Sequence, residues 1–246
     1  MKRLEAKGIC KRYSGVDILK DVNVFVNEGE LVSVLGVSGA GKTTLFNVLS
    51  GLELPEAGQV LLQGRDITGK PGNVSYMLQK DLLLPYRKVV DNVALPLLIG
   101  GMPKKEARAK AAAYFAEFAI DGCQEKYPRQ LSGGMRQRAA LLRTYLASKG
   151  VALLDEPFSA LDTITKSAIH KWYLQMMAQL DLATFFITHD IDESILLSDR
   201  IYILAGRPGT ISREIVVDRQ GTPKAEFNLD PRFLEYKKII MAELHL

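Results

Sequence analysis

The 246-residue sequence has few of the residues that build metal or disulfide sites, with only two cysteines and three histidines. Cys10 and Cys123 lie far apart and outside any metal-ligand spacing, which indicates free thiols of a reducing compartment. No apolar run approaches the ~20 residues of a membrane-spanning helix, and the nearest stretch, Val93–Gly101, contains Pro96. The opening residues also lack the apolar core of a secretory signal. We therefore expect a soluble chain that reaches a membrane only through partners.

The sequence also lacks a strong charge bias. Its formal net charge is +4, with 24% charged and 47% hydrophobic residues. This balance is typical of a globular protein, and the positive charge is too weak to indicate a nucleic-acid partner. The length is that of one large domain or two closely joined subdomains, with enough residues to bury a core.

The first third of the chain contains a strand, a glycine-rich loop and a helix in succession. Val22–Val26 and Leu31–Leu35 have the composition of strands, and a turn separates them. The second strand leads into Gly36–Gly41, which we call the phosphate loop, and Lys42–Ser50 then continues as a helix. This order is the structural context in which a glycine-rich loop binds phosphate.

The rest of the chain alternates helices with strands. Helix patterns cover Lys104–Phe118, Gly133–Ser148, a region near Ile164–Gln179, and Pro231–Leu246. Strand patterns cover Val151–Asp155, Ala183–Thr188 and, as a short β segment, Arg200–Val217. Alternating strands and helices predict an α/β fold with a mainly parallel sheet covered on both faces. The stretch from Met77 to about Gly150 would then be a helical insertion.

The phosphate loop and the two residues after it match the full pattern Gly-x-x-x-x-Gly-Lys-Thr. Glycines let backbone N–H groups turn around an anion, and the following helix adds its positive end. Lys42 is expected to contact the β- and γ-phosphates of a nucleotide, and the Thr43 hydroxyl to bind Mg²⁺. The alternative is a chance glycine turn in front of a helix.

A second candidate segment is the apolar strand Val151–Asp155, which ends in two acids, Asp155 and Glu156. A strand buried on both faces delivers the acid at its carboxyl end into a site. Asp155 is expected to hold Mg²⁺, and Glu156 to orient and polarise an attacking water. The alternative is that the two acids simply begin a loop.

The third segment is Leu-Ser-Gly-Gly-Met-Arg-Gln-Arg at 131–138, which we call the signature segment. Ser132 is a good N-cap for the helix that follows it. Gly133 and Gly134 expose N–H groups beside the positive helix end, which makes a second anion site. Composition alone also allows a turn and a cap with no further role.

The signature segment resembles the motif that defines the ATP-binding cassette (ABC) ATPases, and further family motifs follow in the expected order. Tyr13 resembles the aromatic residue that stacks on adenine, and Gln79 the glutamine that senses Mg²⁺ and the attacking water. Ser-Ala-Leu-Asp at 159–162 is similar to the loop that crosses the dimer interface, and His189 to the switch histidine at the γ-phosphate. The resemblance spans Leu4 to about Val217.

The resemblance implies a P-loop ABC fold with an N-terminal antiparallel β subdomain and a helical signature subdomain. Residues 1–220 would form the nucleotide-binding domain, with the helical part at about 80–150, and residues 221–246 a short helical extension. Two copies would pack head to tail, so that each ATP lies between one phosphate loop and the partner's signature segment. The implied catalytic residues are Glu156, His189 and Gln79, and the implied Mg²⁺ ligands are Thr43, Gln79 and Asp155. The implied ATP-binding residues are Tyr13, Gly36, Val37, Ser38, Gly39, Ala40, Gly41, Lys42, Thr43, Thr44, Ser132, Gly133, Gly134 and Asp162.

Two stretches resemble those of importer ATPases. The residues after Gln79, with Pro85 and Tyr86, are similar to the groove that receives a helix of the membrane subunit. Ala205–Ile211 contains an Arg-Pro-Gly-x-Ile stretch that is common in the nitrate, sulfonate and taurine importer group, which includes importers of vitamin precursors. Physically, that stretch indicates only a Pro-Gly turn between strands. The resemblance implies a peripheral subunit on the cytoplasmic face, with permease partners and, indirectly, an extracytoplasmic solute-binding protein.

Two other functions fit parts of the sequence. A soluble cassette ATPase, such as those of iron–sulfur cluster assembly, would carry the same ATP chemistry. A small-molecule kinase would leave the signature segment and His189 without a role. His170 and His245 match no motif and are expected at the surface, and Trp172 is expected to pack on a helix. No ligand-sensing domain is expected after Val217.

Overall fold

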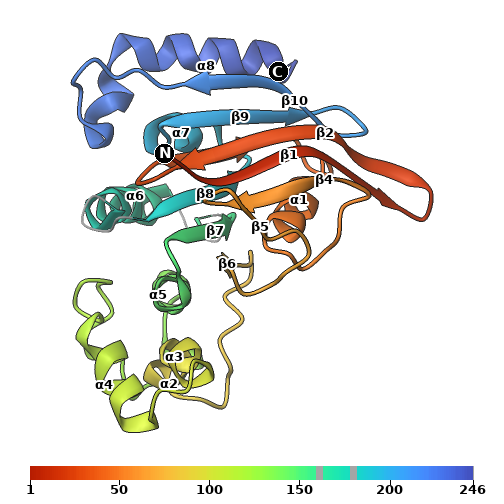
Figure 1. The fold of residues 1–246 in the computed structure, drawn as a ribbon. Helices are drawn as coiled ribbons and strands as arrows, with labels where there is room; N and C mark the ends of the chain where they lie inside the picture. Colours follow the sequence, from red (N-terminus) through yellow and green to blue (C-terminus); the bar gives the residue numbers. More distant parts are fainter. Residues whose placement is uncertain (159–162, 178–181, 246) are drawn as a thin grey trace.

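The computed structural model describes residues 1–158, 163–177 and 182–245, and two sheets organise them (Figure 1). The first is an antiparallel sheet with the strand order β2-β1-β4-β5. Its strands are β1 (Lys2–Tyr13), β2 (Val16–Asn27), β4 (Ala57–Leu62) and β5 (Arg65–Asp66). The expected strand at Val22–Val26 is therefore the second half of a longer one, which pairs with β1 along its length.

The second sheet has six strands in the order β10-β9-β3-β8-β7-β6. Pairing is parallel throughout except between β9 and β10, so the predicted mainly parallel sheet is confirmed. Its strands are β3 (Leu31–Leu35), β6 (Ser75–Met77), β7 (Val151–Asp155), β8 (Ala183–Thr188), β9 (Arg200–Ala205) and β10 (Thr210–Val216).

The central strands of this sheet are buried on both faces, which explains their unbroken apolar sequences. Successive side chains point to opposite faces of a strand, so neighbours on one strand enter different cores. Phe185 packs in the core shared with the antiparallel sheet and α1 (Lys42–Leu49). Phe186 packs in the core shared with the helices of the other face. The sheet thus joins two hydrophobic cores.

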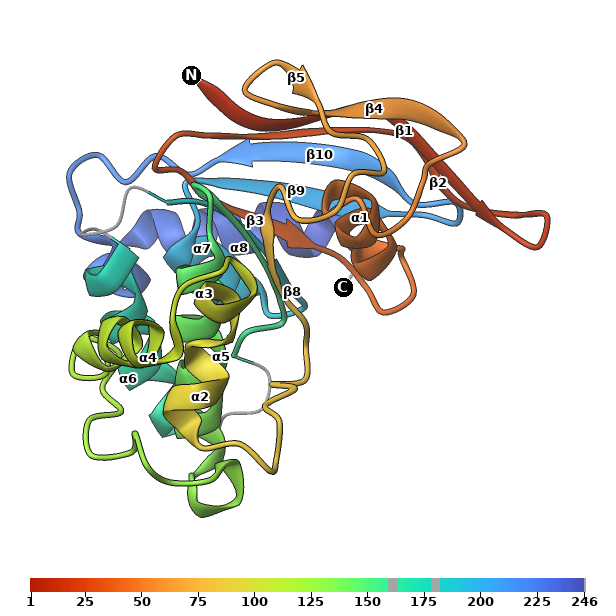
Figure 2. The same cartoon turned by 60° about the horizontal axis from the view of Figure 1, so that its bottom comes forward.

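The helices on that other face form a layer that extends away from both sheets (Figure 2). They are α2 (Val89–Val93), α3 (Leu95–Ile99), α4 (Lys104–Ala113), α5 (Gly133–Ala147) and α6 (Thr163–Met177), with a 3₁₀ turn, η1, at Pro128–Gln130. α5 contacts α2, α3 and β6, so it connects the projecting helices to the sheet.

One predicted helix is shorter than expected. The helix expected at Lys104–Phe118 ends at Ala113, and residues 114–119 form turns. The N–H of Ile120 donates to the carbonyl of Phe115 at 3.0 Å, and Ala119 has a φ of 51°. These turns place Phe115 and Phe118 in the hydrophobic core, where both are fully buried. Burial of the two rings therefore overrides the helix propensity of the sequence.

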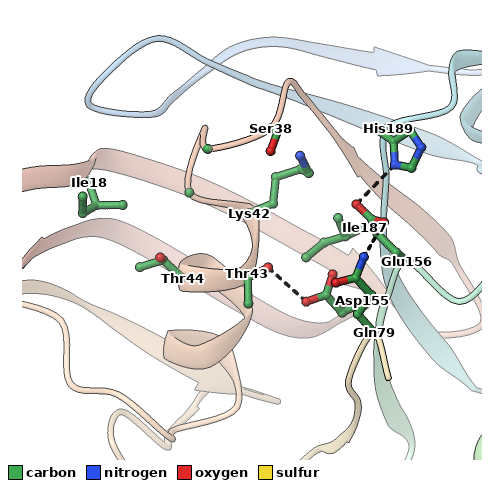
Figure 3. Close-up of a pocket in the computed structure, with 12 residues that line it drawn as sticks. Ile18, Ser38, Lys42, Thr43, Thr44, Gln79, Asp155, Glu156, Ile187 and His189 are labelled. Atoms are coloured by element: carbon green, nitrogen blue, oxygen red, sulfur yellow. Dashed lines mark hydrogen bonds and ion pairs between the residues drawn. The ribbon is translucent and has the colours of Figure 1, made fainter. Parts of the chain in front are cut away.

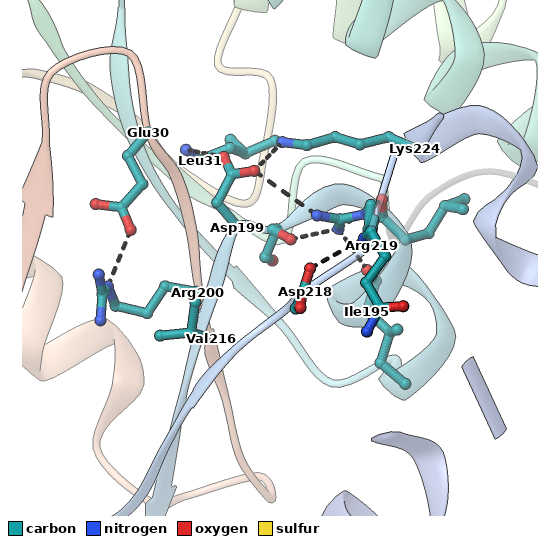
Figure 4. Close-up of polar contacts among 12 residues, drawn as sticks. Glu30, Leu31, Ile195, Asp199, Arg200, Val216, Asp218, Arg219 and Lys224 are labelled. Atoms are coloured by element: carbon teal, nitrogen blue, oxygen red, sulfur yellow. Dashed lines mark hydrogen bonds and ion pairs between the residues drawn. The ribbon is translucent and has the colours of Figure 1, made fainter. Parts of the chain in front are cut away.

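The C-terminal segment packs on α7 (Ile191–Leu197) and forms a third core with β9 and β10. It contains the 3₁₀ turn η2 (Lys224–Leu229) and α8 (Pro231–Glu243), which begins where the sequence predicts. The guanidinium of Arg219 donates to the carbonyls of Ile195, Leu196 and Ser198 at the end of α7 (Figure 4). A cation at this position satisfies the carbonyls that a helix end leaves unpaired.

Asp199 also binds the C-terminal segment, through two cationic side chains. Its carboxylate lies 2.7 Å from the ammonium of Lys224 and 3.7 Å from the guanidinium of Arg219. Burial lowers the pKa of both cations, while Asp199 acts in the opposite direction. The N–H of Leu31 also donates to Asp199, at 3.0 Å, so one carboxylate connects β3 to the C-terminal segment.

We predict that Arg219→Ala destabilises the protein by about 2 kcal/mol, because three helix-end carbonyls lose a charged donor. For a chain of this size the thermal midpoint should fall by several degrees, which calorimetry of the ligand-free protein would measure. Arg65→Ala, at an exposed position on β5, is the matched control and should leave the midpoint unchanged. Equal midpoints for the two variants would contradict this account of the C-terminal segment.

Candidate functional site

The phosphate loop connects the end of β3 to the start of α1. Gly39 and Gly41 have φ values of 80° and 97°, a backbone conformation that side chains with a Cβ rarely adopt. The ammonium of Lys42 donates to the carbonyls of Gly36 and Val37 at 2.7 and 3.0 Å, so it lies within the curve of the loop. Burial lowers the pKa of Lys42, and the nearby acids Glu156 and Asp155 oppose that shift.

A cavity of about 600 Å³ opens beside this loop (Figure 3). It is lined by Ile18, Ser38, Gly39, Gly41, Lys42, Thr43, Thr44, Gln79, Asp155, Glu156, Ile187 and His189. The strand–loop–helix context therefore brings Lys42 and Thr43 to one cavity together with both predicted acids. Three other predicted residues of the loop are not part of the described lining: Gly36, Val37 and Ala40.

Thr43 and Asp155 meet at the floor of the cavity. The Thr43 hydroxyl donates to a carboxylate oxygen of Asp155 at 3.0 Å, and the hydroxyl of Tyr76 lies 3.5 Å from the same oxygen. Asp155 is only 5% exposed, and burial raises its pKa. A buried carboxylate beside a hydroxyl offers the oxygen ligands that Mg²⁺ prefers, so these residues fit that ion.

Glu156 is held between Gln79 and His189. The amide nitrogen of Gln79 donates to one carboxylate oxygen at 2.9 Å, and Nδ1 of His189 lies 3.2 Å from the other. The backbone of Glu156 has a φ of 47°, and its N–H donates to the carbonyl of Ile187. A left-handed conformation at a residue with a Cβ is costly, and such positions cluster at functional sites. The Glu156 carboxylate lies between the side chains of Gln79 and His189 in the cavity lining (Figure 3).

Tyr13 lies at the end of β1 and is not among the residues that line the cavity in the described part of the chain. Its hydroxyl donates to Glu53, and the ammonium of Lys11 lies 5.2 Å from the ring centre. Burial and the neighbouring Glu53 raise the pKa of Tyr13 to about 12. The phenol is therefore neutral at physiological pH, and its ring is partly exposed.

The signature segment lies at the start of α5, in the helical layer. The Ser132 hydroxyl accepts from the N–H of Met135 at 3.3 Å, which confirms the predicted N-cap. Across the described ranges, neither Ser132 nor the two glycines that follow it line the cavity. Asp162, predicted from its motif, lies outside the described residues.

The sequence did not indicate every residue at the site. Ile18 lines the cavity and Tyr76 reaches Asp155, but both belong to strands whose patterns show only burial or alternation.

His170 was expected at the surface, and that prediction is wrong. It is buried, its ring packs edge-on against Phe158, and Nε2 lies 3.8 Å from a carboxylate oxygen of Glu193. Trp172 packs as predicted, edge-on against Phe118.

The fold and site define a nucleotide-binding cassette, and comparisons identify the family. The family model described as ABC transporter matches residues 19–159, so the chain belongs to the ABC transporter ATPases. A similar solved structure is the cassette MJ0796, as a dimer in a post-hydrolysis state bound to ADP and phosphate. That structure has a TM-score of 0.76 and 28% identity, and the match covers 87% of this chain and 99% of the other.

Similar relatives are ATP-binding proteins of importers. The formylaminopyrimidine import protein ThiZ of Halalkalibacterium halodurans is 43% identical over 79% of this chain and 76% of the relative. The taurine import protein TauB of Pseudomonas putida is 34% identical over 99% of this chain and 96% of the relative. This chain is therefore an ATPase that fits the energy-coupling subunit of an importer. None of the helices in the described ranges is long and apolar enough to cross a bilayer.

Proposed function

We propose that two copies of this chain form the ATP-driven engine of an importer on the cytoplasmic face of a membrane. Its solute would be of the nitrate, sulfonate and taurine type or a vitamin precursor, delivered by an extracytoplasmic solute-binding protein. Relatives that import taurine and a pyrimidine support this solute class. The observation that carries the ATPase part is the single cavity that joins the phosphate loop to Glu156.

Each side chain of the cavity has a role in this proposal. Lys42 and the loop N–H groups bind the nucleotide phosphates, and Tyr13 stacks on the adenine at the rim. Thr43, Asp155 and the amide oxygen of Gln79 would hold Mg²⁺, which would neutralise charge on the nucleotide phosphates. The buried carboxylate of Asp155 supports this assignment, because burial disfavours its charge until a cation compensates it.

Glu156 acts as the base in this mechanism. Its carboxylate accepts a proton from the attacking water, whose oxygen then forms a bond to the γ-phosphorus as the bond to ADP breaks. Gln79 and His189 hold the two carboxylate oxygens from opposite sides. His189 is 61% exposed, so it can also reach the γ-phosphate at the open side of the cavity.

The proposed dimer would supply a signature segment to the nucleotide cavity of each chain. Within residues 1–158, 163–177 and 182–245, the signature segment does not reach the chain's own cavity. A helix N-terminus that begins with Gly133 and Gly134, the first of them exposed, is suited to bind the γ-phosphate of a neighbouring copy. The MJ0796 cassette, which is a dimer in a state bound to ADP and phosphate, supports the pairing of two copies. In this proposal the copies pack head to tail, so that each ATP lies between one phosphate loop and the partner's signature segment.

We predict that Glu156→Gln binds ATP but hydrolyses it about 10²- to 10⁴-fold more slowly, because the amide cannot accept the water's proton. The unhydrolysed ATP should hold the two copies together, and light scattering would detect a dimer. Glu28→Gln, at an exposed position remote from the cavity, should hydrolyse ATP normally and show no ATP-stabilised dimer. A monomeric Glu156→Gln chain at saturating ATP would count against the composite site.

The surface that would receive the permease is formed by residues that follow Gln79 in the sequence. A hollow of about 490 Å³ is lined by Tyr86, Arg87, Lys88, Asp91, Leu98, Lys104 and Tyr127. Tyr86 is 73% exposed, and large exposed aromatic residues are typical of binding sites. In this proposal residues 1–220 form the ATPase domain, with residues 80–150 as the inserted part that carries the hollow, and 221–246 a short extension.

Purification of the tagged chain from detergent-solubilised membranes, followed by mass spectrometry, tests the importer function. We predict that an integral-membrane permease is recovered, and that Tyr86→Ala reduces its recovery severalfold without changing the ATPase rate of the isolated chain. Leu234→Ala, at an exposed position on α8 and outside the lining of the hollow, is the control for loss of a large exposed apolar side chain. Recovery of soluble assembly proteins alone would favour the alternative, a soluble cassette ATPase, with the same ATP chemistry.

A further inference from the structure

The turn between β9 and β10, Gly206–Gly209, lies beside β2 (Figure 1). It also approaches the phosphate loop closely, at Ala40. The N–H of Gly209 donates to the carbonyl of Ile18 at 2.8 Å, and its carbonyl accepts from the N–H of Lys20 at 3.0 Å. These two bonds attach the turn to β2, beside the residue that lines the nucleotide cavity.

The same turn presses directly on the phosphate loop. A Cβ on Gly209 would lie 2.2 Å from the carbonyl oxygen of Ala40, and a Cβ on Gly36 would lie 2.3 Å from that of Leu204. Both distances are too short for any side chain, so glycine is required for the close approach. Gly36, the first residue of the phosphate loop, therefore packs on Leu204 of β9. Ala40, near the end of the loop, packs on Gly209 of the turn. The Pro-Gly sequence thus supports the loop.

Arg207 projects from this turn beside Gly39. One guanidinium nitrogen lies 3.3 Å from the position that a Cβ of Gly39 would occupy, and Gly39 lines the cavity. The side chain is exposed, and no carboxylate pairs with it among the residues that the structure describes. The guanidinium is therefore a cation at the outer wall of the phosphate loop.

The charges of the side chains that line the cavity indicate what the Arg207 guanidinium can do there. Lys42 is the one cationic side chain of the described lining, and it faces two carboxylates, Asp155 and Glu156. A polyphosphate brings several further negative charges to that cavity. A guanidinium just behind Gly39 would offset part of this repulsion, more strongly for each additional phosphate.

We propose that Arg207 is a positioning residue for the nucleotide polyphosphate, acting through the wall of the phosphate loop. This inference rests on the proposed nucleotide site. It assigns a role to the Arg-Pro-Gly stretch, whose glycine allows the close approach and whose arginine supplies the charge.

The test is equilibrium competition of ATP, ADP and AMP against a fluorescent adenine nucleotide, with the full chain and a chelator to prevent hydrolysis. Arg207→Gln should weaken ATP binding about fivefold and ADP binding about twofold, and leave AMP unchanged. Raising the salt from about 50 mM to about 500 mM should reduce the difference in ATP affinity between Arg207→Gln and the wild type, because exposed charges are screened. Arg207→Lys should restore most of the affinity, since it keeps the charge.

Arg213→Gln is the matched control, because it removes the same charge from an exposed position on β10 of the same hairpin. It should bind all three nucleotides like the wild type. Equal losses for ATP and AMP, or equal affinities in Arg207→Gln and the wild type, would overturn the proposal. A wild-type chain without affinity for ATP would instead refute the nucleotide site itself.

Discussion

Parallel pairing of β3, β8, β7 and β6 is the constraint on which the rest of the site depends. In this register Leu35 pairs with Thr188, Asp155 with Ile187, and Met77 with Leu154. All four strands therefore end at one edge of the sheet. The phosphate loop, His189, Glu156 and Gln79 each follow one of these ends, so segments far apart in sequence converge on one cavity. The polar residues need only short connections to reach it.

This dependence explains how much could be predicted from the sequence. The phosphate loop and the acids of β7 follow apolar strands, and the burial of those strands determines where their carboxyl ends lie. The N-cap at Ser132 is a local feature, and it too was predictable. Resemblance to a family added Gln79 and His189, whose positions beside Glu156 no local pattern reveals.

Other features could not be predicted, because they arise from contacts between distant segments. The turns after α4 exist because Phe115 and Phe118 enter a core that the helix alone does not form. His170 is buried because α6 packs beside Phe158 and α7, although a single histidine has no pattern of its own. The left-handed backbone of Glu156 and the position of Arg207 behind Gly39 likewise depend on tertiary packing.

The signature segment lies apart from the cavity of its own chain, and this separation bears directly on function. α5 belongs to a helical layer that extends away from the sheet, whereas the cavity lies at the sheet's edge (Figure 2). In the proposed dimer, a site divided in this way between two copies would make hydrolysis conditional on their association. Nucleotide binding would then move the helical layers and any partner bound to them.

Mixing two inactive variants tests this central claim most directly. Lys42→Ala removes the ammonium of the phosphate loop, and Gly133→Asp places a carboxylate in the signature segment. If the site is composite, an equal mixture should recover roughly a quarter of the wild-type ATPase rate, because half of the dimers are mixed and each contains one intact site. A mixture as inactive as its components would contradict the account.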